Sequence, residues 1–117
     1  MQTFRDLVVW QKAVQLASYI YALTSQFPPE ERYGLASQMQ RAAVSIPSNI
    51  AEGKLRGSPK EFAHFLRIAF GSGGELETQI EVAKLLPKTK ELDFRPVELL
   101  LSEIMRMLNV MISKASA

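Results

Sequence analysis

Cysteine is absent from the 117-residue sequence, and histidine occurs once, at His64. Without cysteine there is no disulfide scaffold, thiolate zinc site, cysteine nucleophile or redox dithiol. Glu61 and His64 match the Glu-x-x-His pattern of di-iron bundle proteins, but such a site needs a second copy of the pattern. We therefore expect no metal and no cofactor, with Glu61 capping the start of a helix and His64 on a polar face or an interface.

Long apolar runs are also missing. No stretch approaches the ~18 uncharged apolar residues of a transmembrane helix. The first residues, Met1 to Asp6, do not combine a basic region with an apolar run, so they do not resemble a secretory signal. We expect no contact with a membrane and a cytoplasmic location.

Signatures of catalysis are missing as well. There is no Gly-x-Ser-x-Gly elbow, and the run of residues 71–74 (Gly-Ser-Gly-Gly) lacks the Gly-Lys-Ser/Thr ending of a phosphate-binding loop. Glu77 and Glu81 are four residues apart and Lys84 follows three residues later, which is typical of a solvated helix face. We expect a protein that is not an enzyme.

An excess of one charge is nearly absent, because 14 basic residues stand against 12 acidic ones. The small surplus is concentrated between residues 32 and 67, where six basic residues accompany only Glu52 and Glu61. One interpretation is an ordinary solvated surface. The other is a basic patch that meets phosphate groups.

What the chain does have is apolar residues at helical spacing. It is 47% hydrophobic and 22% charged, which suits a single globular domain over residues 1–117. Four segments show a period of three to four residues: residues 3–26, residue 30 to the glycines at 53 and 57, residues 59–86, and the chain after residue 93. Short linkers between long helices predict an all-α, antiparallel, up-down-up-down four-helix bundle.

Two segments depart from a plain helix. Pro47 lies inside the second segment and predicts a kink there, with Ser45, Ser48 or Asn49 bonding to exposed backbone groups. The three glycines of residues 71–74 disfavour a helix by roughly 2–3 kcal/mol. We expect a close approach of another backbone at that point.

The first helix carries more apolar surface than one bundle buries. A second stripe beside its core face predicts that copies of the chain form a homo-oligomer. This stripe consists of Leu7, Trp10, Val14, Ala17 and Tyr21.

The stretch from residue 41 to residue 53, Arg-Ala-Ala-Val-Ser-Ile-Pro-Ser-Asn-Ile-Ala-Glu-Gly, closely resembles the four-helix bundle family that is also called the 23S rRNA intervening-sequence protein family. Other matching residues extend the resemblance over nearly the whole chain: Phe4, Leu7, Val9, Trp10, Gly34, Leu35, Ser37, Gln38, Met39, Glu61, Phe62, Phe65, Leu66, Ile68, Ala69, Gly71, Ser72, Glu75, Leu76, Glu77 and Gln79.

The resemblance implies antiparallel four-helix bundles that assemble into a ring-like homopentamer. Some members are encoded within intervening sequences of large-subunit rRNA genes. A related branch serves as the accessory protein of diversity-generating retroelements and is thought to bind nucleic acid and reverse transcriptase. Two positions here depart from the family pattern toward less positive charge, Gln40 and Phe70, and both weaken the case for nucleic acid.

Two hypotheses for function remain. In the first, an oligomer binds RNA or DNA by phosphate contacts without reading bases, through Arg41, Lys54, Arg56, Lys60 and Arg67. In the second, the chain is a scaffold for a protein partner, with candidate contacts Trp10, Tyr19, Tyr21, Tyr33 and Phe70.

Overall fold

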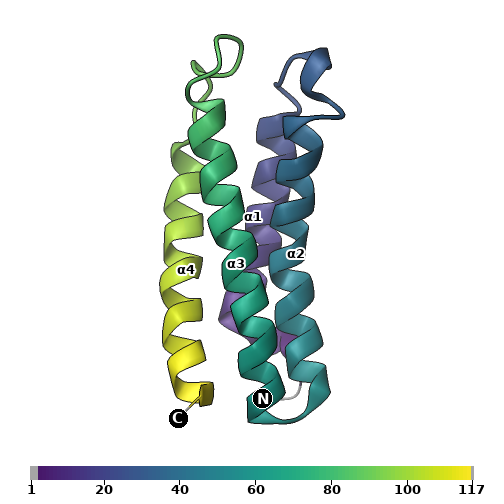
Figure 1. The fold of residues 1–117 in the computed structure, drawn as a ribbon, viewed down its shortest axis with the longest axis vertical. Coiled ribbons are helices and arrows are strands. Elements are labelled where there is room, and N and C mark those ends of the chain that lie inside the picture. The colour runs from purple at the N-terminus through teal and green to yellow at the C-terminus, as the bar shows by residue number, and fades with distance from the viewer. Residues whose placement is uncertain (1–2, 117) are drawn as a thin grey trace.

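The computed structural model describes residues 3–116, and these residues form a bundle of helices that alternate in direction (Figure 1). The elements in chain order are η1 (Phe4–Asp6), α1 (Val8–Thr24), η2 (Pro29–Glu31), α2 (Leu35–Arg56), α3 (Pro59–Ala83) and α4 (Arg95–Ser116), where η denotes a 3-10 turn. Both α1 and α3 pack against α2 and α4. The predicted antiparallel four-helix bundle is confirmed, with extents of 45 × 19 × 19 Å.

The first helix begins later than its apolar pattern predicts. Thr3 caps the separate turn η1: its hydroxyl accepts the N–H of Arg5 at 3.0 Å, and the Asp6 carboxylate accepts the N–H of Thr3 at 3.1 Å. Leu7 then has extended backbone, with ψ of 123°. The helix therefore starts at Val8 rather than at residue 3.

The other helix ends differ from expectation for similar reasons. The Glu31 carboxylate accepts the N–H of Leu35 at 3.1 Å, so α2 starts at Leu35 and not near residue 30. At the end of α3, the Thr89 hydroxyl donates to the Ala83 carbonyl at 2.6 Å. That bond satisfies a terminal acceptor, and α3 ends at Ala83 instead of residue 86.

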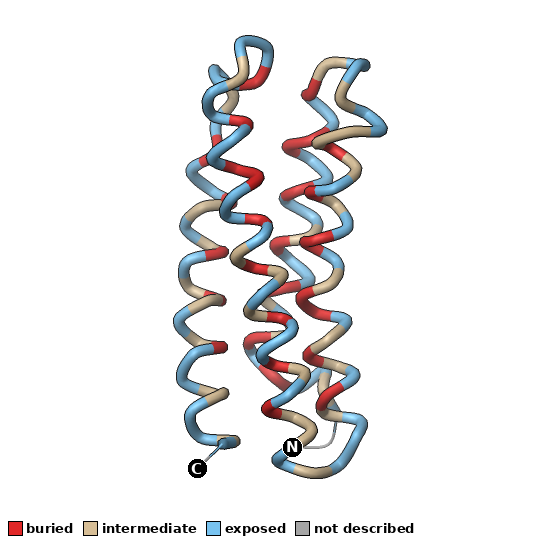
Figure 2. Tube along the Cα trace, viewed as in Figure 1, coloured by how far each residue is buried: buried red, intermediate tan, exposed pale blue. Residues whose placement is uncertain are grey.

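The core is a continuous column of aliphatic side chains along the bundle axis, shown by the inward-facing buried positions in Figure 2. Each such side chain contributes about 1.5–3 kcal/mol by leaving water. The largest fully buried ones are Val9, Leu16, Ile20, Met39, Ile46, Ile50, Leu66, Leu76, Ile80, Leu101, Ile104 and Leu108.

Helix α2 continues through the buried Pro47. The neighbouring polar side chains bond to the backbone one turn back: the Ser48 hydroxyl donates to the Val44 carbonyl, and the Asn49 amide donates to the Ser45 carbonyl, each at 2.8 Å. This confirms the structural role expected for the hydroxyls and amide around the proline.

Among the described residues, the close approach of another backbone expected within residues 71–74 is not found: at Gly73 the neighbour is a side chain, because a Cβ there would overlap the sulfur of Met105 on α4. A Cβ on Gly71 or Gly74 would have no described atom within 4 Å apart from the adjacent residues and the backbone of its own turns. The contact with less mobile atoms lies at Gly53, where a Cβ would meet the Phe65 Cβ and the Phe62 carbonyl oxygen of α3. The sequence pattern suggested that this glycine marks a helix end, but it lies inside α2.

The second apolar stripe of α1 is only partly used by the bundle. Leu7 is buried and Trp10 and Ala17 are half-buried, whereas Val14 and Tyr21 are exposed. No helix in residues 3–116 combines the length and apolar character required to span a bilayer.

Candidate nucleic-acid interface

Three of the five basic residues proposed as phosphate contacts meet at the turn between α2 and α3. Lys54 and Arg56 lie in the last turn of α2, and Lys60 is the second residue of α3. The turn is tight because Gly57 adopts φ of +86°, a conformation that side chains disfavour. These cations consequently share one end of the bundle (Figure 1).

The start of α3 is held by Ser58, whose hydroxyl accepts the N–H of Glu61 at 3.2 Å. Glu61 lies in the first turn of α3, as expected. Its carboxylate lies 3.4 Å from the Ser58 hydroxyl and 3.8 Å from the Arg56 guanidinium. His64, three residues further on, is exposed and makes an edge-to-face contact with Phe65.

The structure does not bring Arg41 and Arg67 into this cluster. Arg41 is exposed on α2, 13 residues before Lys54, which is about 20 Å along the helix. Arg67 lies about 10 Å along α3 from Lys60, and its guanidinium donates to the Ser116 hydroxyl on α4 at 2.7 Å.

The clustered cations differ in how far their charge is already compensated. The Arg56 guanidinium lies 2.9 Å from the Glu52 carboxylate and stacks 5.0 Å from the centre of the Phe65 ring. Lys54 and Lys60 form no ion pair within residues 3–116. The two lysines therefore have the uncompensated charges of the cluster, whereas Arg56 pairs with Glu52 on α2 and Glu61 on α3.

Lys114 is a further basic residue at this end that sequence reasoning missed. It lies in the last turn of α4, across a cleft from Lys54. The two lysines are 60 positions apart in the chain, so no local pattern connects them. The signal that could have found Lys114 is topological: in an antiparallel bundle, α2 and α4 finish at the same end.

The whole bundle is electrically polarised along its axis. The half that contains the α2–α3 turn comprises residues 3–15, 46–71 and 106–116, with eight basic and three acidic side chains. The opposite half, residues 16–45 and 72–105, has six basic and nine acidic side chains. A polyanion is consequently attracted to the first end and repelled by the second.

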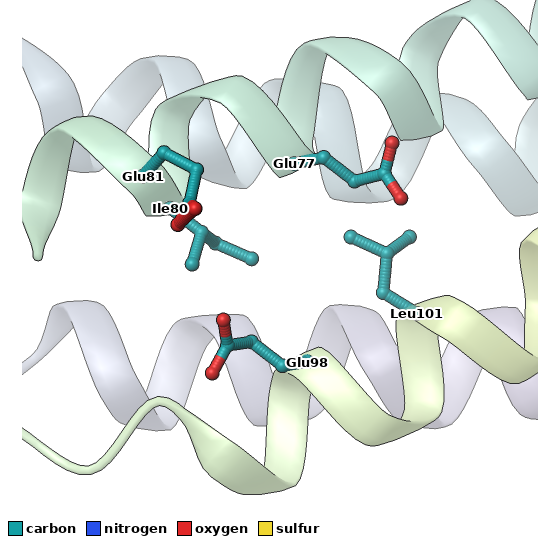
Figure 3. Close-up of a pocket in the computed structure, with 5 residues that line it drawn as sticks. All are labelled: Glu77, Ile80, Glu81, Glu98 and Leu101. Atoms are coloured by element: carbon teal, nitrogen blue, oxygen red, sulfur yellow. The ribbon is translucent and has the colours of Figure 1, made fainter.

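The acidic half includes a groove of about 310 Å³ between α3 and α4 (Figure 3). Ile80 and Leu101 point into it, and carboxylates reach it from both helices. Lys84 bridges two of them, at 2.8 Å from Glu98 and 3.4 Å from Glu81, and these carboxylates raise the pKa of its ammonium. The ion pair of Glu81 with Lys84 confirms the solvated charged face expected on α3.

The two positions that depart from the family pattern are both partly buried. The Gln40 amide donates to the Thr24 hydroxyl at 3.0 Å, which joins α2 to α1. Phe70 packs against the core beside a surface hollow between α3 and α4. Gln40 lies in the acidic half, and Phe70 lies ten residues after Lys60, about 15 Å along α3. Neither therefore removes a cation from the cluster around Lys54.

The four helices and the sequence stretch of residues 41–53 agree with a comparison against known families. No curated protein matches the chain. The family model described as 23S rRNA-intervening sequence protein matches residues 5–110. The match includes all four helices except the last turns of α4, and the chain belongs to the 23S rRNA-intervening sequence protein family.

Proposed function

We propose that this chain is a non-enzymatic, homo-oligomeric bundle protein of the cytoplasm that binds structured RNA or DNA through its basic end. The observation that carries the proposal is the concentration of eight basic side chains against three acidic ones in that half of the bundle. Lys54, Lys60 and Lys114 supply the phosphate contacts, and their long side chains allow them to follow an irregular backbone.

Oligomerisation strengthens such a surface. One bundle offers only a few lysines for phosphate contacts, and each contacted phosphate contributes modestly to the affinity for nucleic acid. The ring of five copies that the family resemblance implies places five basic ends on one particle, so that avidity multiplies their effect. The exposed part of the α1 stripe is the surface we assign to contacts between copies.

The test measures binding of fluorescently labelled structured RNA and duplex DNA by anisotropy at about 50 and 200 mM salt. We expect the triple substitution Lys54→Gln, Lys60→Gln, Lys114→Gln to weaken binding at least tenfold at the lower salt. It should also reduce the slope of log affinity against log salt by about 2 to 3, because each lost phosphate contact removes about one unit.

The matched control removes the same charge from the other end, with Arg32→Gln, Lys90→Gln and Arg95→Gln. These three side chains are exposed and form no ion pair in the described part of the chain. Equal losses of affinity in both variants would show that binding depends only on the net charge of the protein. If the first variant binds as well as the unmodified protein, the proposal is wrong.

The second candidate is a scaffold that holds a protein partner. It is favoured by large apolar side chains that the bundle leaves in water, including Tyr33 at 89% exposed and Leu85 at 81% exposed. Of the other aromatic candidates, Trp10 packs edge-to-face on Phe4 with ring centres 5.2 Å apart. A purification from the native host that yields a saturable protein partner, lost on Tyr33→Ser with Leu85→Ser, would favour this function.

A further inference from the structure

A cleft of about 430 Å³ lies at the basic end, between the α2–α3 turn and the last turns of α4. Its volume is within the range of sites for small organic groups. The phosphate contacts proposed above explain the lysines near it. They do not explain why the space between those lysines is hollow and apolar.

The cleft is hollow because two of its lining residues are glycines whose size is dictated by the fold. A Cβ on Gly53 would lie 2.7 Å from the Phe65 Cβ, so the packing of α2 against α3 leaves no room for a side chain at Gly53. Gly57 has φ of +86° and ends α2. Phe62 from α3 and Met111 from α4 are half-buried and supply the apolar walls.

The charges around the cleft are positive. The Lys54 ammonium lies 5.7 Å from the centre of the Phe62 ring. Lys114 lines the cleft from α4, and no acidic residue among residues 3–116 lines it. The nearest carboxylates in sequence, Glu52 and Glu61, belong to the Arg56 ion pairs. The site therefore suits a ligand with an apolar body and anionic groups at its edges.

A nucleotide within a strand has this combination of properties. Its base presents a flat face to aromatic or sulfur-containing side chains, and a phosphate precedes and follows it. We propose that the cleft takes one unstacked base of a single-stranded RNA or DNA segment, with Phe62 and Met111 against the base and Lys54 and Lys114 on the flanking phosphates. This inference rests on the proposed function and narrows it to strands with accessible bases.

The test compares three labelled ligands by anisotropy: a ten-nucleotide single-stranded RNA, an abasic ribose-phosphate strand of the same length and charge, and an RNA duplex. A base that enters the cleft strengthens binding of the single strand by about fivefold or more over the abasic strand, the low end of one stacking contact. The duplex has a higher charge density and serves as the reference for phosphate contacts alone, because its paired bases cannot enter the cleft.

A substitution at Ala115, which also lines the cleft, separates base contacts from charge. Ala115→Phe fills the cleft without removing a cation, and we expect it to lower single-strand affinity to the abasic level while abasic affinity is unchanged. The control is Ser113→Phe, which is exposed on the same turn and does not line the cleft. Circular dichroism and thermal melting verify that both variants fold.

The outcomes are distinguishable. If the single strand and the abasic strand bind with equal affinity, and that affinity falls with salt as phosphate contacts require, the cleft does not take a base. The proposed function then stands without the further inference. If no ligand binds at about 50 mM salt, both proposals are wrong. If an acidic peptide rich in leucine binds more tightly than any oligonucleotide, and Ala115→Phe abolishes this, the cleft belongs to a protein partner and the inference is overturned.

Discussion

At the scale of single residues, the glycines inside helices have different surroundings. Gly53 lies where α2 touches α3, and a Cβ there would meet the Phe65 Cβ at 2.7 Å and the Phe62 carbonyl oxygen at 3.3 Å. Backbone and Cβ atoms cannot move aside without separating the helices. Gly74 on α3 has open space around it. Both residues are glycine and have the same intrinsic helix propensity. Only the atoms packed around each one make the effect of a substitution different.

We therefore expect opposite effects of the same substitution at these two glycines. Gly53→Ala should lower the free energy of unfolding by about 1–3 kcal/mol through overpacking, although alanine favours the helix by nearly 1 kcal/mol. Gly74→Ala should raise it by up to ~1 kcal/mol, since only the propensity gain applies. Urea unfolding of the two variants measures both. A stabilised Gly53→Ala protein would show that α2 and α3 are not in tight contact.

At the scale of elements, the helix ends are held by polar contacts between segments distant in sequence. At the acidic end, Glu30 of η2 pairs with Lys88, which lies in the loop between α3 and α4. The hydrogen bond from Lys88 lowers the pKa of the Glu30 carboxyl below its ordinary value of 4.5. This pair links the two loops that close the same end of the bundle.

The lowered pKa predicts how stability depends on pH. Because the folded-state pKa lies below the unfolded one, the contribution of Glu30 is present above pH 4.5 and is lost as pH falls through the folded-state pKa. Glu30→Gln should therefore lower the melting temperature slightly at neutral pH and not at about pH 2. The effect should be small and weakened by salt, since the pair is exposed.

Glu91→Gln is the control, because Glu91 is an exposed acid of the loop that carries Lys88 and has no ion pair in residues 3–116. Thermal melts of the two variants across the pH range provide the measurement. If Glu30→Gln and Glu91→Gln change the melting temperature identically at every pH, the loops are not joined by this pair.

At the scale of the whole molecule, apolar surface remains outside the core. Val14 and Tyr21 on α1 are 42% and 51% exposed, and they continue the stripe whose other members are buried or half-buried. An apolar helix face of this kind gains stability when another copy covers it. The bundle axis also separates the basic end from the acidic one, so copies packed side by side in a ring would collect their basic ends on one face.

The oligomer prediction is tested by light scattering. We expect the unmodified protein to have a mass several times that of one chain, and Val14→Gln with Tyr21→Gln to shift it toward the monomer. The unfolding free energy of the monomer should change only modestly, because about half of the surface of each residue is already in water. Val110→Gln, an exposed apolar position on α4, is the control. Dissociation by this control and not by the α1 pair would assign the interface elsewhere.

Much of the fold follows from the sequence by itself. Helical periodicity is a local property, so it predicts four helices and most of their buried side chains. The short linkers between them predict their alternating directions. The ends of the helices are less predictable. Thr3, Glu31 and Thr89 form hydrogen bonds that shift the boundaries of three helices, and the spacing of apolar residues carries no information about these bonds.

The candidate site depended on tertiary structure. Lys54 and Lys60 are near in sequence, and their clustering could be anticipated, but Arg41 lies about 20 Å from them because a helix rises 1.5 Å per residue. Lys114 joins them because the antiparallel arrangement brings the end of α4 beside the end of α2. Local spacing thus determines which residues share a helix face. The packing of distant helices decides which charges and apolar walls share a site.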